Sequence, residues 1–133
     1  MSYDIHLEFI VPAKPEVVMQ LLTDEKLLRR WSGGEAKVEK RGGGNFEMFD
    51  GWVYGKVLKI TDKELAYTWK TTDWAEDVAA SEVHYKLEKD KEGTKVILNH
   101  TGLPNEEEMN EHKEGWDDQF FGLMEEYIYS MKL

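Results

Sequence analysis

Apolar and polar residues alternate from residue 3 to residue 11, with the apolar side chains at Tyr3, Ile5, Leu7, Phe9 and Val11. A period of two is typical of a strand that buries one face, and it places His6 on the polar face. After Pro15 the spacing of apolar residues becomes helical. Pro15 suits a first helical turn because the N–H groups there have no partner inside the helix. A strand followed by a helix is therefore predicted.

Two short helices are predicted between residues 15 and 34. The first ends near Thr23 and Asp24, and its apolar stripe consists of Val17, Val18, Leu21 and Leu22. The second is expected to end at Gly33 and Gly34, because glycine readily adopts the left-handed conformation of a helix C-terminus. Its apolar side chains are Leu27, Leu28 and Trp31.

From residue 35 to residue 102 the pattern is one of strands and turns, without a helical period. Glycines 42–44 and the pair Asp50 and Gly51 are expected to supply positive φ angles at turns, and residues 61–64 and 90–93 are polar turns. The six predicted strands are Glu35–Lys40, Asn45–Phe49, Trp52–Ile60, Leu65–Lys70, Glu82–Glu88 and Thr94–Thr101. Together with the first strand they predict one antiparallel sheet of six or seven strands.

The rest of the chain is predicted to be one long helix from about Asn105 to about Lys132. Asn105 is a suitable N-cap, and the glutamates after it are favoured at the positive end of the helix dipole. Gly115 lies inside this helix at a cost of about 1 kcal/mol relative to alanine, so we expect it to permit close approach of another backbone. The apolar stripe of this helix consists of Trp116, Phe120, Leu123, Tyr127 and Met131, flanked by Phe121, Met124 and Ile128. The pattern predicts one α+β domain, residues 1–133, whose sheet wraps around this helix.

The amino-acid composition limits the expected cellular location and binding partners of the protein. Acidic residues outnumber basic ones 27 to 17, which gives a formal net charge of −10 and repels phosphate backbones and anionic lipids. Nucleic acid and membrane are therefore not expected as partners. The sequence has no cysteine and no apolar stretch near the ~20 residues that span a bilayer. A cytoplasmic location is the default expectation.

Seven short segments carry a family resemblance along nearly the whole chain: Pro15–Val18, Leu22–Leu27 leading into Trp31, Gly43–Phe46, Gly55–Val57, Leu65–Trp69, Thr94–Gly102 and Gly115–Trp116. In their order and spacing they resemble the helix-grip (START-related, SRPBCC) superfamily, and within it the domain of the activators of the ninety-kilodalton heat-shock chaperone ATPase. The resemblance implies a curved antiparallel sheet that grips the C-terminal helix, with a cavity between them in many relatives.

The resemblance is more informative about fold than about function. Members of the superfamily bind lipids, sterols, polyketides or plant hormones, and some are cyclases or dehydratases. Eukaryotic chaperone activators carry an additional N-terminal domain that engages the chaperone, whereas this sequence starts directly with the helix-grip strand. ATPase activation is therefore not carried over from the resemblance.

The sequence contains few candidates for catalysis or for binding a metal or cofactor. None of the four histidines is paired at the spacing of a metal site, and there is no Gly-x-Ser-x-Gly nucleophile elbow. The glycines after Arg41 lack the lysine of a phosphate-binding loop. No catalytic residue, metal or cofactor is expected. His100 is the histidine predicted to point inward, where a core histidine satisfied by a neighbour is favoured over a ligand contact.

Large rings and flexible methionines on facing surfaces predict a ligand cavity between the sheet and the C-terminal helix, although the same rings would also fill a core. The predicted lining is Trp31, Met48, Trp69, Tyr85, His100, Trp116, Phe120 and Met124. Trp74 lies in a polar connection and is expected to be a solvent-accessible lid or partner contact. The leading hypothesis is non-catalytic binding of a small apolar molecule. The alternatives are a module that binds a chaperone or another protein and, third, a cyclase- or dehydratase-like enzyme.

Overall fold

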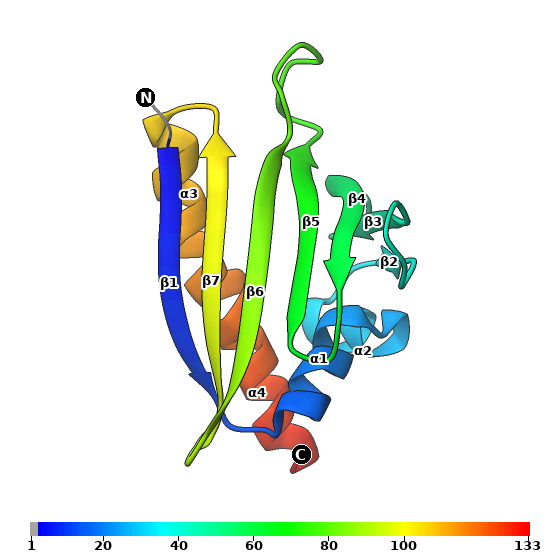
Figure 1. Cartoon of the computed structure of the whole chain (residues 1–133), viewed down its shortest axis with the longest axis vertical. Coiled ribbons are helices and arrows are strands. Elements are labelled where there is room, and N and C mark those ends of the chain that lie inside the picture. Colours follow the sequence, from blue (N-terminus) through cyan, green and yellow to red (C-terminus); the bar gives the residue numbers. More distant parts are fainter. Residues whose placement is uncertain (1–2) are drawn as a thin grey trace.

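The pairing of strands in the computed structural model, which describes residues 3–133, follows the sequence alternation closely. Seven antiparallel strands lie in the order β1-β7-β6-β5-β4-β3-β2 (Figure 1). The strands are β1 (Tyr3–Val11), β2 (Lys37–Val38), β3 (Asn45–Met48), β4 (Val53–Ile60), β5 (Glu64–Thr71), β6 (Ser81–Asp90) and β7 (Gly93–Leu103). Six of the seven join in chain order, whereas β1 pairs with β7, from Tyr3 opposite Leu103 to Val11 opposite Thr94. The predicted sheet is confirmed.

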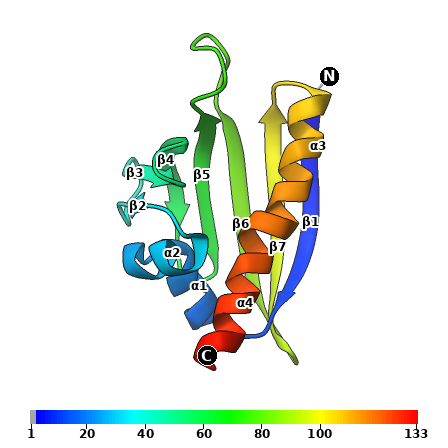
Figure 2. The same ribbon diagram turned by 180° about the vertical axis from the view of Figure 1, so that it is seen from behind.

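The C-terminal helix lies across one face of this sheet, over β1, β7 and β6 (Figure 2). Its parts are α3 (Glu106–Gly115), a π-helical segment η1 (Trp116–Phe121) and α4 (Gly122–Met131). The inward side chains of β1, Ile5 and Val11, are buried beneath it, while His6 lies on the exposed face and hydrogen-bonds Asn99. The long helix over an antiparallel sheet makes this an α+β helix-grip fold, as predicted.

Two short helices, α1 (Pro15–Thr23) and α2 (Glu25–Ser32), lie near the C-terminal end of the long helix (Figure 2). The Asp24 side chain caps α2 by accepting from the Leu27 N–H, and Gly33 ends it at a φ of 80°. Trp31 fixes the two helices to each other, since its Nε1–H donates to the Leu21 carbonyl at 2.8 Å. Both helices end where the sequence predicted, the first near Thr23 and Asp24 and the second at Gly33.

The long helix differs from its prediction at the segment Trp116–Phe121, which forms a wider π turn. Trp116, Phe120 and Phe121 are all buried, and the wider π turn brings them onto a narrower side of the helix than a uniform period of 3.6 residues would. The Gly122 N–H bonds the Asp117 carbonyl across this turn. A Cβ at Gly122 would lie 2.6 Å from that carbonyl oxygen, so the close backbone approach is at Gly122.

The expectation of a close backbone approach at Gly115 was wrong. A Cβ built there meets nothing within 4 Å. Gly115 instead lines the pocket described below, where the absence of a side chain leaves space.

The two glycines therefore give a matched pair of predictions. Gly115→Ala should raise the free energy of unfolding by up to about 1 kcal/mol, because alanine has the higher helix propensity and meets no neighbour. Gly122→Ala should lower it by about 1–3 kcal/mol, because the new methyl group presses on a backbone oxygen that cannot move alone. Urea denaturation of both variants measures these changes. Equal effects at the two positions would show that the π turn does not depend on Gly122.

Candidate functional site

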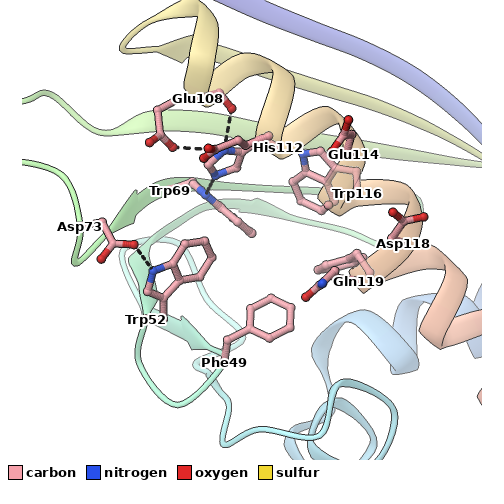
Figure 3. Close-up of a pocket in the computed structure, with 13 residues that line it drawn as sticks. Phe49, Trp52, Trp69, Asp73, Glu108, His112, Glu114, Trp116, Asp118 and Gln119 are labelled. Atoms are coloured by element: carbon pink, nitrogen blue, oxygen red, sulfur yellow. Dashed lines mark hydrogen bonds and ion pairs between the residues drawn. The ribbon is translucent and has the colours of Figure 1, made fainter.

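A pocket of about 610 Å³ opens between the C-terminal helix, the turn joining β3 to β4, and the end of β5. Phe49 of that turn lies opposite Gln119 of the helix, and Trp52 lies on the side of His112, with ring centres 6.3 Å apart (Figure 3). The full lining is Phe49, Trp52, Trp69, Asp73, Glu108, Glu111, His112, Glu114, Gly115, Trp116, Asp118, Gln119 and Phe120. Five of these thirteen residues are phenylalanine or tryptophan and five are aspartate or glutamate, so the walls combine rings with carboxylates.

The wall opposite the helix is formed by a turn with unusual backbone geometry. Phe49 and Asp50 have φ angles of 54° and 60°, in the left-handed region that a bulky residue such as phenylalanine rarely adopts. Trp52 is 39% exposed, and its Nε1–H donates to the Asp73 carboxylate at 2.7 Å. The turn therefore holds two rings at the pocket edge, one of them at a conformational cost.

Two crossed hydrogen bonds between tryptophan and histidine join the sheet to the helix behind this wall. Trp69 of β5 donates its indole N–H to Nε2 of His112 in α3, at 3.1 Å. Trp116 of η1 donates its indole N–H to Nδ1 of His100 in β7, also at 3.1 Å. The two indoles lie 5.0 Å apart and the two imidazoles 5.3 Å apart, measured between ring centres. This four-ring cluster fixes the helix on the sheet, and three of its members, Trp69, His112 and Trp116, line the floor of the pocket.

The hydrogen-bond partners define the tautomer of each imidazole, because an indole N–H can only donate. Nδ1 of His100 accepts, so its Nε2–H donates to Ser81 Oγ at 2.8 Å, and that hydroxyl donates to the Trp69 carbonyl at 2.7 Å. Nε2 of His112 accepts, so its Nδ1–H donates to the Glu108 carbonyl at 2.9 Å. Burial of the ring lowers the pKa of His100 to about 3, and the neighbouring His112 adds to this shift. His100 is therefore neutral at physiological pH.

The predicted lining residues fall into two groups. Trp69, Trp116 and Phe120 line the pocket. The other five are buried and are not part of its lining: Trp31, Met48, Tyr85, His100 and Met124.

Ring packing explains this division. Phe46 stacks on Tyr67 with ring centres 3.7 Å apart, and the Tyr67 and Tyr85 hydroxyls share a hydrogen bond at 2.5 Å. Trp31 packs edge-on against Phe120 at 4.8 Å. These rings fill the space between the deeper part of the sheet and the helix, so the open part lies toward the β3–β4 turn.

The expectation that Trp74 is solvent-accessible was wrong. Its side chain is buried at 9% exposure, with its ring centre 6.0 Å from that of His112. The connection between β5 and β6 turns back at once, since the Trp74 N–H bonds the Thr71 carbonyl, and this brings the ring inward. Trp74 packs behind the His112 side of the pocket.

Phe49, Trp52, Asp73 and His112 were missed as lining residues by the sequence reasoning. The signal for Trp52 was a large ring next to the turn residues Asp50 and Gly51. The signal for His112 was its position four residues before Trp116, on the same helix face. Within residues 3–133 no group of three or more acidic residues and histidines is arranged to hold a metal ion, and no helix is long and apolar enough to cross a membrane.

A seven-stranded antiparallel sheet laid around a long C-terminal helix, with an aromatic pocket at the helix, defines a helix-grip (SRPBCC) protein. The particular family follows from a family model described as Activator of Hsp90 ATPase homolog 1-like protein, which matches residues 12–128. The chain belongs to this family.

Known relatives are similar in sequence and in fold. The mouse activator of 90 kDa heat shock protein ATPase homolog 1 is 27% identical over 121 residues, which cover 90% of this chain and 35% of the mouse protein. The chain thus spans about a third of the length of the curated relatives it matches. The crystal structure of an HSP90 activator from Plasmodium falciparum is 29% identical with a TM-score of 0.81, and covers 96% of each chain. That of CalU16 from Micromonospora echinospora is 28% identical with a TM-score of 0.70, and covers 92% of this chain and 74% of the other.

Proposed function

We propose that this domain binds a small hydrophobic molecule, without chemical conversion, in the pocket between the C-terminal helix and the β3–β4 turn. The observation that carries the proposal is the pocket itself. Its volume of about 610 Å³ lies within the roughly 300–1,000 Å³ of small-molecule sites, and five phenylalanine or tryptophan residues belong to its lining. Phe49 supports it further, because a costly left-handed backbone is retained where it places a ring at the pocket.

The hydrogen bonding of the two buried histidines favours binding over catalysis. A general acid or base must reach the substrate with a ring nitrogen. Both ring nitrogens of His100 are bonded to protein atoms, of Trp116 and Ser81, and both of His112 are bonded to Trp69 and Glu108. These imidazoles therefore hold the pocket floor in place and have no nitrogen left for a substrate.

Gly115→Leu tests the proposal by filling the pocket from the helix. We expect N-phenyl-1-naphthylamine, a neutral fluorescent probe, to bind the unmodified protein saturably and to bind Gly115→Leu at least about ten-fold more weakly. The free energy of unfolding should stay unchanged or rise by up to about 1 kcal/mol, because leucine is the better helix former and a Cβ there meets no neighbour. Probe fluorescence and urea denaturation measure the two quantities.

Gly115→Ala and Phe120→Trp are graded controls for this experiment. Gly115→Ala should weaken probe binding less than Gly115→Leu does, because a methyl group fills less of the pocket. Phe120→Trp should weaken probe binding by adding volume at a second position of the same helix, with a stability cost of about 1–3 kcal/mol because Phe120 is buried. Undiminished binding by Gly115→Leu would place the probe elsewhere and count against this pocket as the ligand site.

A second candidate function is interaction with a heat-shock chaperone. It is favoured by the likeness to an HSP90 activator over 96% of both chains. If the chain acts in this way, adding it to a purified 90 kDa heat-shock protein should raise the ATPase rate of that protein. Gly115→Leu distinguishes the two functions, because filling the pocket should leave activation intact if the contact is made by the outer surface.

A further inference from the structure

The charges around the pocket are all of one sign. Five carboxylates belong to its lining and no lysine or arginine does. Three of them, Glu111, Glu114 and Asp118, lie within four residues of Gly115 along the helix. Glu108 lies nearer the start of the helix, on the same side of the pocket as Asp73 (Figure 3). Glu111 lies four residues before Gly115, about one α-helical turn, so the two share a helix face, and Glu114 and Asp118 join them in the pocket lining.

Helix stability does not account for these three carboxylates. Acidic side chains are favoured only in the first turn of a helix, where Glu106, Glu107 and Glu108 already lie. Glu111, Glu114 and Asp118 come later along the helix, where the dipole no longer stabilises them. All three are exposed, and within residues 3–133 none takes part in a side-chain hydrogen bond or ion pair of the structure. Their oxygens are therefore available to a ligand.

The other two carboxylates have structural partners. Asp73 accepts from the Trp52 indole at 2.7 Å, and the Glu108 carboxylate lies 3.5 Å from His112 Nδ1. They hold pocket rings in place and also add negative potential. The pocket thus combines electron-rich ring faces, including that of the 39%-exposed Trp52, with a negative rim.

We propose that the natural ligand of this pocket is a small organic cation, an apolar or aromatic body that carries a quaternary or protonated ammonium group. This rests on the proposed function and specifies its ligand class. The apolar body lies against the rings of the pocket lining, and the ammonium group lies over Trp52 beside Asp73, within the negative potential of all five carboxylates. Ring faces attract such a cation through their quadrupole, and the rim attracts it through its charge. An anionic ligand of the same shape would be repelled.

Three probes of nearly one shape test the charge: benzyltrimethylammonium, its neutral isostere neopentylbenzene, and the anion phenylacetate. Titrations followed by tryptophan fluorescence at low salt should give a Kd for the cation at least about ten-fold lower than for the neutral isostere, and no saturable signal for the anion. The preference for the cation should shrink in 0.5 M salt, because exposed charges are screened there.

A charge-matched pair of triple variants assigns the effect to the rim. Glu111→Gln with Glu114→Gln and Asp118→Asn should bring the cation's Kd to within about three-fold of the neutral isostere's. The control changes Asp62→Asn, Glu125→Gln and Glu126→Gln, which alters net charge equally at exposed positions outside the pocket lining. The control should keep the preference for the cation.

The outcomes separate this inference from the proposed function. If the neutral isostere binds as tightly as the cation, the inference that the ligand is a cation is overturned, while the proposed binding of a hydrophobic molecule is retained. If both triple variants lose the preference equally, the rim is not its source and the inference is overturned. If none of the probes binds and the fluorescent probe does not bind either, the proposed function fails together with the inference.

Discussion

Lowering the pH from 7.5 to 5 is expected to reduce the free energy of unfolding by about 2 kcal/mol through His100 alone. The ordinary pKa of an unfolded histidine is about 6.5, and the pKa of His100 in the fold is lowered to about 3. Between these values the unfolded state binds a proton that the folded state does not. Stability therefore falls as the pH drops below about 6.5 and levels off near pH 3. Urea denaturation at a series of pH values measures it.

The hydrogen bonding of His100 gives this prediction a structural cause. Nδ1 accepts from the Trp116 indole and Nε2 donates to Ser81. A second proton would place two donors against each other at Nδ1, inside a site with no exposure to water. Protonation of His100 thus breaks the bond that holds η1 on the sheet.

Two histidine variants serve as controls. His100→Gln should be less stable at pH 7.5 but should lack most of the decrease between pH 7.5 and 5. His6→Gln should not reduce that decrease, because the exposed His6 has its pKa raised by its hydrogen bond to Asn99 and so shifts stability in the opposite direction. The lowered pKa values of Glu8, Glu39 and Glu64 affect stability mainly below pH 5. A decrease that persists in His100→Gln would contradict the assignment.

The strands and helices were largely predictable because each rests on a local pattern. The alternation in β1 can be recognised from neighbouring residues alone. The same holds for the N-cap at Asn105, whose side chain accepts from the Glu108 N–H at 2.8 Å. The π turn was not predictable, since it depends on how three rings pack against the sheet. A glycine inside a helix, such as Gly122, indicates a local packing reason, but the sequence does not show which neighbouring atom leaves no room for a side chain.

The pocket was predicted in part for a related reason. A pattern can show that Tyr85 and Trp69 point inward, but whether the space between inward rings is filled depends on distances that sequence does not contain. Phe46 and Tyr67 close the deeper part by stacking, whereas Gly115 leaves the outer part open. The candidate site is therefore displaced from the predicted cavity toward the β3–β4 turn.

Trp116→Ala should lower the free energy of unfolding by about 3–5 kcal/mol, the range for removing a large buried ring. Trp116 is 2% exposed and packs against Phe120 and Trp69, with ring centres at 4.7 and 5.0 Å. Trp116→Phe keeps most of this packing but leaves Nδ1 of His100 without a donor, so it should cost about 1–3 kcal/mol. Urea denaturation at pH 7.5 measures both variants while His100 is neutral.

Trp52→Ala is the matched comparison, since both tryptophans line the same pocket but only Trp116 also belongs to the core. Trp52 is 39% exposed and its indole N–H bonds an exposed carboxylate, so its removal should cost no more than about 1 kcal/mol. It should nevertheless weaken benzyltrimethylammonium binding by about ten-fold, because Trp52 is the most exposed ring of a pocket lined by carboxylates. A loss of stability from Trp52→Ala as large as that from Trp116→Ala would mean that the pocket rings form one continuous core. A small loss of stability with a large loss of binding would identify Trp52 as a residue whose main role is to hold the ligand.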